Sequence, residues 1–97
     1  MRNWIEKLGN KLKQEGNATG WHEEALIPQF KISLTEGRND RWLLVEQYRI
    51  DEEGNRRYTS RGMIKIYEDE YDYLNAIIKD LNKIVQDKFI EIFNSFE

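Results

Sequence analysis

The sequence predicts an α+β fold: a four-stranded antiparallel sheet with a long helix after it and a short amphipathic helix before it. Two patterns predict this class. Between residues 26 and 66, segments rich in β-branched and aromatic residues alternate with turn sequences. From Glu68 onward, apolar residues recur at steps of three and four, with no glycine or proline among them. The length of 97 residues suits one domain.

The first helix is expected over residues 2–14, because apolar residues fall there at helical spacing between charged ones. These apolar residues are Trp4, Ile5, Leu8 and Leu12. Residues 15–20 contain two glycines and an asparagine, which break a helix and indicate a linker. The sequence therefore predicts a helix and linker over residues 1–20 and one β-sheet and helix domain over residues 21–97.

Four strands are expected in the middle of the chain. The first, residues 26–34, has Pro28 near its start, where a missing amide donor is tolerated. Its apolar residues alternate from Phe30 to Leu34, as on a strand with one buried face. Turn sequences that contain glycine separate the segments. The other strands are expected over residues 42–50, 56–59 and 62–66.

The strand over residues 42–50 has two different faces. One face carries Trp42, Leu44, Tyr48 and Ile50. The other begins with Leu43 and Val45 and ends in Arg49. We expect the first face, and Trp42 with it, to lie in the core, although a β-bulge would reverse the assignment.

The C-terminal helix is expected to run for about 26 residues, roughly 39 Å at 1.5 Å per residue. Acidic residues crowd its first turn, where carboxylates complement the helix dipole. Its apolar stripe continues to Phe96, beyond what strands of ~17–20 Å can cover. The stripe therefore needs the N-terminal helix or a second copy of the chain. We expect a homodimer whose interface contains Leu74, Ile78, Leu81, Val85, Phe89 and Ile92.

The sequence contains few residues of the types that support catalysis. With no cysteine and only His22 as a histidine, disulfides, thiolate metal sites and a Ser-His-acid triad find no support. The carboxylates of residues 68–70 could hold a divalent cation, but the helix dipole explains them more simply. We therefore expect a non-enzyme with no catalytic residue, metal site, cofactor or small-molecule substrate.

The N-terminal residues lack the apolar core of a signal peptide, and no apolar run approaches the ~20 residues of a membrane span. We expect a cytoplasmic protein without a membrane partner, with association with the nucleoid as an alternative. The net charge of −3 is unevenly distributed. Residues 29–66 carry eight basic and six acidic side chains, whereas residues 67–97 carry three basic and eight acidic ones. The predicted strands thus have a local balance of +2.

The strand region mixes cations with aromatic rings, as proteins that bind single-stranded nucleic acid do. Cations follow the phosphates in such proteins, and rings stack on unpaired bases at ~1–3 kcal/mol each. We expect binding of single-stranded DNA or RNA with weak sequence preference. The candidate residues are Lys31, Arg41, Tyr48, Arg49, Arg56, Arg57, Tyr58, Arg61 and Lys65.

Three segments together resemble the family of the transcriptional coactivator PC4. They are Trp42–Gly54, Arg61–Ile66 and Glu70–Leu74, within a match that spans residues 30–85. Residues 30–47 are also similar to one PUR-type repeat. The resemblance implies a homodimer with packed helices and curved sheets that form grooves for single-stranded DNA. It also implies phosphate contacts from Arg56, Arg57 and Arg61, and stacking by Tyr48 and Tyr58.

An alternative function is a protein-interaction or structural dimer of the same fold that does not bind nucleic acid. The two functions predict different surroundings for the basic residues of the strands. If the basic residues of the strands are dispersed, or are paired with acidic residues such as Glu46 and Asp51–Glu53, the alternative is favoured. The sequence leaves open whether DNA or RNA is preferred and which sheet face is exposed.

Overall fold

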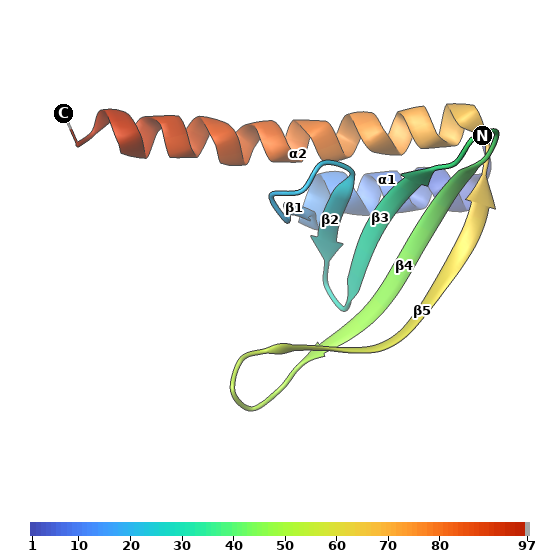
Figure 1. Ribbon diagram of the computed structural model, residues 1–97, viewed down its shortest axis with the longest axis horizontal. Coiled ribbons are helices and arrows are strands. Elements are labelled where there is room, and N and C mark those ends of the chain that lie inside the picture. Colours follow the sequence, from blue (N-terminus) through green and yellow to red (C-terminus); the bar gives the residue numbers. More distant parts are fainter. Residues whose placement is uncertain (97) are drawn as a thin grey trace.

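In the computed structural model, which describes residues 1–96, two helices cover one face of a five-stranded antiparallel sheet (Figure 1). The α+β class and both helices are confirmed, whereas the expectation of four strands is wrong. The strands follow one another in the order β1-β2-β3-β4-β5, each antiparallel to its neighbour. The elements are α1 (Asn3–Glu15), β1 (Asn17–Ala18), β2 (Glu24–Ile27), β3 (Phe30–Glu36), β4 (Arg41–Ile50), β5 (Arg56–Ile66) and α2 (Glu68–Asn94).

The predicted strand over residues 26–34 is a hairpin. β2 ends at Ile27, β3 begins at Phe30, and these two residues pair with each other. The intervening Pro28 and Gln29 form a two-residue turn, in which Gln29 has a φ of 74°. A proline followed by a residue with positive φ matches the type II turn. Glutamine seldom adopts this conformation, so the sequence gives little sign of the reversal.

The predicted strands over residues 56–59 and 62–66 are one strand, β5. Gly62 does not interrupt it, because this residue pairs with Val45. The irregularity lies closer to the hairpin tip: Gln47 pairs with Ser60, whereas Tyr48 pairs with Tyr58. Thr59 is therefore the extra residue of a β-bulge, which bends a strand and increases its twist. The end of the β4–β5 hairpin bends and passes beyond the β2–β3 turn, toward the side of the sheet where β1 and β2 lie (Figure 1).

The predicted linker belongs to the folded core region. Gly16 follows α1, and β1 pairs with β2 to form one edge of the sheet. Ile5 and Leu12 of α1 have no exposed surface and join the same apolar core as β2, β3, β4 and α2. The N-terminal helix is therefore part of the packing of the sheet and α2.

The core face of the sheet is the one opposite to our expectation. Leu43 is fully buried and pairs with Leu34, while Val45 pairs with the buried Ile32. Trp42 lies on the other face and is half-buried, so the expectation that it belongs to the core is wrong. The register of β4 against β3 decides this, because Leu34 and Ile32 already form the apolar side of β3.

The two helices run in the same direction and begin at the same end of the molecule (Figure 1). Gly9 of α1 lies so close to Tyr73 of α2 that a Cβ atom at Gly9 would overlap the tyrosine ring. A Cβ on Gly16 would lie 2.9 Å from Leu81, so α1 ends at the level of Leu81. Beyond that level, α2 has no neighbouring helix in the described chain.

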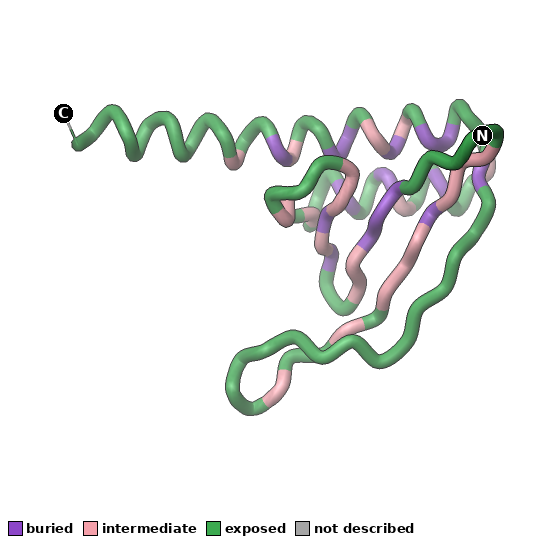
Figure 2. The backbone as a smooth tube through the Cα atoms, in the orientation of Figure 1, coloured by how far each residue is buried: buried purple, intermediate pink, exposed green. Residues whose placement is uncertain are grey.

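The last part of α2, residues 83–94, projects past the sheet and α1 as an exposed rod (Figure 2). We call this segment the α2 overhang; its length is about 18 Å. Phe89, Ile92 and Phe93 are 62%, 53% and 73% exposed. Two members of the predicted dimer interface, Leu74 and Ile78, are instead fully buried within the protomer. They face α1 and the sheet, so they have no surface left for a second chain.

Candidate nucleic-acid interface

The sheet face turned away from the helices carries several of the predicted binding residues. We call it the outer face. Register places Lys31 of β3, Glu46 of β4 and Arg61 of β5 in one row across it. The Lys31 ammonium lies 3.9 Å from a Glu46 carboxylate oxygen and 3.7 Å from an oxygen of Glu24. This lysine is therefore held at the centre of the face by two carboxylates.

Cations and tyrosines alternate where the β4–β5 hairpin bends. The Lys31 ammonium lies 5.8 Å from the centre of the Tyr58 ring. Tyr58 meets Tyr48 edge to face, with ring centres 6.1 Å apart, and the Arg56 guanidinium lies 6.0 Å from the centre of the Tyr48 ring. Such contacts contribute ~0.5–2 kcal/mol each and hold the cations beside flat apolar surfaces. We call Lys31, Tyr48, Arg56 and Tyr58 the cation–tyrosine cluster.

The two tyrosines of this cluster differ in exposure. The Tyr48 hydroxyl donates a hydrogen bond of 3.0 Å to the carbonyl oxygen of Ile27, and its ring is half-buried. Tyr58 is 47% exposed. Tyr58 therefore has free ring surface for a ligand, whereas Tyr48 mainly supports it.

A hollow of about 380 Å³ opens beside this cluster, between the bent hairpin and the loop that connects β1 to β2. Its lining residues are Thr19, Trp21, Glu24, Lys31, Arg56 and Tyr58. Trp21 was not among the residues expected from the sequence. It lies in the loop before β2; the pairing of β2 with β3 and the bend of the β4–β5 hairpin bring this loop near Lys31 and Tyr58.

Four of the predicted binding residues are engaged by carboxylates. Besides Lys31, these are Arg41, Arg57 and Lys65. Arg41 lies 3.0 Å from Glu36, and Lys65 lies 2.9 Å from Asp40. Both ion pairs lie at the opposite end of β4 and β5, about 23 Å along the strand from Tyr48. They are therefore not part of the cation–tyrosine cluster.

The third pair is at the hairpin tip, where Arg57 donates to Asp51 over 2.8 Å. The pKa of Asp51 is lowered, first by the backbone amide of Asn55 and then by Arg57 and the amides of Glu53 and Gly54. Asp51 thus fixes both the turn and Arg57. Arg57 is paired directly with Arg49 across the strands, which places two like charges side by side.

Arg49, Arg56 and Arg61 form no ion pair within residues 1–96. All three side chains are on the hairpin, and all three residues are exposed. They are the cations of the predicted set that remain available for a polyanion.

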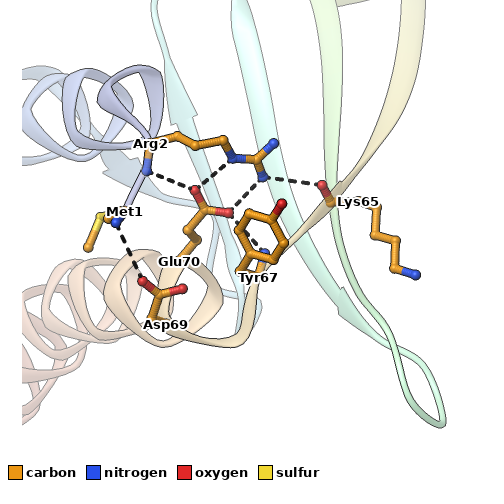
Figure 3. Close-up of polar contacts among 6 residues, drawn as sticks. All are labelled: Met1, Arg2, Lys65, Tyr67, Asp69 and Glu70. Atoms are coloured by element: carbon orange, nitrogen blue, oxygen red, sulfur yellow. Dashed lines mark hydrogen bonds and ion pairs between the residues drawn. The ribbon is translucent and has the colours of Figure 1, made fainter.

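A separate polar cluster joins the start of α1 to the start of α2 (Figure 3). The Arg2 guanidinium donates to both carboxylate oxygens of Glu70, at 2.9 and 2.6 Å, and to the carbonyl oxygen of Lys65 at 3.3 Å. The amides of Arg2 and Tyr67 also donate to Glu70, at 3.2 and 2.9 Å. The Arg2 guanidinium further lies 4.8 Å from the centre of the Tyr67 ring.

Glu70 is fully buried, and these bonds stabilise its charged form. The hydrogen bond from Arg2, together with those from backbone amides, lowers the pKa of Glu70 to about 2 despite its burial. The same partner raises the pKa of Arg2. This contact is structural: it holds α1 against α2, and it gives Glu70 a role beyond the dipole effect expected from the sequence.

Burial, followed by the nearby charges of Glu23 and Glu36, raises the pKa of Tyr71 in the core.

Within residues 1–96, the structure contains no cluster of three or more metal-ligating side chains and no helix that is long and apolar enough to cross a membrane. His22 is exposed in the β1–β2 loop. Comparison with known proteins finds no matching family model, curated protein or solved structure.

Proposed function

We propose that this protein binds single-stranded DNA or RNA on its outer sheet face, without catalysis, and acts as a homodimer. The observation that carries the proposal is the cation–tyrosine cluster, in which Arg56 has no carboxylate partner within residues 1–96, and beside which lies Arg61, also without one. Cations next to exposed rings are what single-stranded nucleic acid requires, because phosphates and unpaired bases alternate along it.

In this proposal, Arg56 and Arg61 contact phosphates and Tyr58 stacks on a base. Arg49 pairs with Arg57 on the opposite side of the hairpin from Tyr48 and is not part of this site. Phosphate contacts carry no sequence information, and an aromatic ring stacks on every base. The protein should therefore show weak sequence preference along most of the bound nucleic acid. The bulge at Thr59 supports this arrangement, since it turns the hairpin so that Tyr58 lies over Lys31.

The homodimer is supported by the α2 overhang. The buried stripe of α2 runs through Leu74 and Ile78 and continues at helical spacing through Val85, Phe89 and Ile92. Burying a side chain of this size contributes ~1.5–3 kcal/mol. A second copy packed along the overhang would bury this stripe and would double the number of unpaired arginines.

Fluorescence anisotropy with a labelled oligo-dT tests the proposal. Replacing Arg56 and Arg61 by alanine should weaken binding and reduce the slope of log K against log salt by about 1.4, the contribution of two phosphates on a single strand. Arg38→Ala is the matched control, because Arg38 is exposed in the β3–β4 turn and its loss changes the net charge in the same direction. Equal effects from the hairpin and control variants, per charge removed, would contradict the proposed site.

A dimeric protein-interaction module is the second candidate, and the ion pairs favour it. Carboxylates engage Lys31, Arg41, Arg57 and Lys65, which are four of the eight basic residues between positions 29 and 66. β5 is moreover an exposed edge strand, and charges on such strands prevent unwanted pairing. A stable dimer that binds no oligonucleotide at low salt would contradict the first proposal and leave this second candidate standing.

A further inference from the structure

Trp21 is an exposed aromatic side chain that borders the hollow next to the cation–tyrosine cluster. It is 71% exposed, and isolated exposed apolar residues are common on protein surfaces. Two features distinguish Trp21: hydrogen bonds fix its backbone, and Tyr58 and Arg56 line the same hollow. Both features point to a ligand contact.

The backbone around Trp21 is fixed by hydrogen bonds on each side. Its amide donates to the Thr19 hydroxyl over 3.2 Å. Its carbonyl oxygen accepts from the Asn82 side-chain amide of α2 over 3.2 Å and from the amide of Glu24 over 3.3 Å. Asn82 is only 7% exposed, so a buried amide of the core is committed to this loop.

The same loop contains unusual backbone conformations. Gly20 has a φ of 90°, and Glu23, which has a side chain, has a φ of 69°. A residue with a Cβ atom adopts this region only at a steric cost. The Glu23 carbonyl is held in place by the amide of Leu34, at 2.9 Å. Such backbone strain is concentrated at functional sites.

Across the hollow from the loop lie Tyr58 and Arg56, with Lys31 beside them. The hollow, at about 380 Å³, is at the small end of the roughly 300–1,000 Å³ typical of small-molecule sites. One nucleotide is thus a suitable occupant. Its base would contact the rings of Trp21 and Tyr58, and its phosphate would face Arg56.

Glu24 supplies the group that can distinguish one base from another. Its side chain is 28% exposed. One carboxylate oxygen lies 3.7 Å from the Lys31 ammonium, and the other accepts a hydrogen bond of 3.4 Å from the Thr19 hydroxyl, so each oxygen has one partner and can accept a second bond. The carboxylate therefore has free acceptor sites. Guanine offers two adjacent N–H donors, at N1 and N2, that match the two oxygens of a carboxylate. Adenine, cytosine and thymine each place an acceptor beside a donor.

The geometry points to a guanine-binding subsite in this hollow, with Trp21 and Tyr58 as stacking surfaces and Glu24 as the group that selects guanine. The inference rests on the proposed function, since it assigns one position within a bound single strand. It adds a local base preference to binding that is otherwise insensitive to sequence.

Anisotropy titrations with two labelled oligonucleotides test this subsite. One is an oligo-dT, and the other has the same length with every third thymidine replaced by deoxyguanosine. The wild-type protein should bind the guanine-containing strand about 5- to 150-fold more tightly, as expected for a good bidentate contact. Trp21→Ala should weaken binding of both strands by about 5- to 150-fold, the equivalent of ~1–3 kcal/mol of stacking. Glu24→Gln should abolish the preference without weakening the binding of oligo-dT.

His22→Ala is the matched control, since it changes the next residue of the same loop and should leave both affinities unchanged. Far-UV circular dichroism of each variant shows whether the fold is retained. Wild-type binding that is equal for both strands, or that Trp21→Ala does not alter, would overturn the subsite and leave the proposed function standing. Failure of the wild-type protein to bind either strand would overturn both.

Discussion

The Arg2 guanidinium donates two hydrogen bonds to the carboxylate of Glu70, at 2.9 and 2.6 Å, across the junction of the two helices. Glu70 has no exposed surface, and the Arg2 side chain is 38% exposed. Removing one partner from a buried ion pair is costly, because the remaining charge keeps its desolvation penalty. This contact therefore makes the docking of α1, and with it the closure of the core, depend on one carboxylate.

Glu70→Gln should lower the free energy of unfolding by about 2–4 kcal/mol at neutral pH. The fall of the Glu70 pKa from 4.5 to about 2 corresponds to about 3 kcal/mol of stabilisation of the folded state. Urea denaturation at one fixed protein concentration measures the change. Glu68→Gln, in the same turn but exposed, is the control and should cost no more than ~1 kcal/mol. A loss no larger for Glu70→Gln than for the control would refute the structural role of the pair.

The same pair should determine the acid sensitivity of the fold. Because the folded-state pKa of Glu70 lies below its unfolded value, its stabilisation is fully present above about pH 4.5 and is lost as the pH falls toward 2. Chemical denaturation at a series of pH values should show this loss in the wild-type protein. The corresponding limb should be shallower in Glu70→Gln, and parallel curves for the two proteins would contradict the assignment.

The α2 overhang should be required for dimerisation. Phe89→Asp combined with Ile92→Asp places charges on its apolar stripe, where burial of a charge is unfavourable. Sedimentation equilibrium at micromolar concentration should show a dimer for the wild-type chain and a monomer for this variant. Lys83→Asp, on the opposite side of the helix, is the control and should remain dimeric. A monomeric wild-type protein would show that the overhang does not associate with itself.

Gln29→Gly should stabilise the β2–β3 turn by up to ~1 kcal/mol. Gln29 has a φ of 74° in an exposed two-residue turn, and glycine adopts this conformation without steric cost. Thermal or urea unfolding measures the difference, with Gln29→Ala as a control that keeps the Cβ atom. If glycine and alanine had the same effect, the left-handed conformation of Gln29 would not be a source of strain.

The long helix and the short amphipathic helix could be predicted from the sequence because their apolar residues follow a helical period over many turns. The strand boundaries were harder to predict from the sequence. Gln29 reverses the chain without a glycine, and Gly62 lies inside a continuous strand, so the usual turn signals mislead at both places. The buried face of β4 depends on register against β3, which Trp42 and Leu43 alone cannot reveal.

The candidate interface was predictable only in part, for related reasons. Arg56, Tyr58 and Lys31 could be proposed from composition, because cations and rings are visible in the sequence. Their convergence requires the bulge at Thr59, and the position of Trp21 requires the pairing of β2 with β3. Which cations are already engaged by carboxylates also depends on contacts between distant residues, as Lys65 with Asp40 illustrates.

The measurement that tests the central proposal most directly is the salt dependence of oligo-dT binding to the wild-type protein. If Arg56 and Arg61 each neutralise a phosphate, anisotropy titrations should saturate at low salt, and log K should fall against log salt with a slope of about −1.4 or steeper. No saturable binding at low salt, or binding that does not change with salt, would contradict the proposed function.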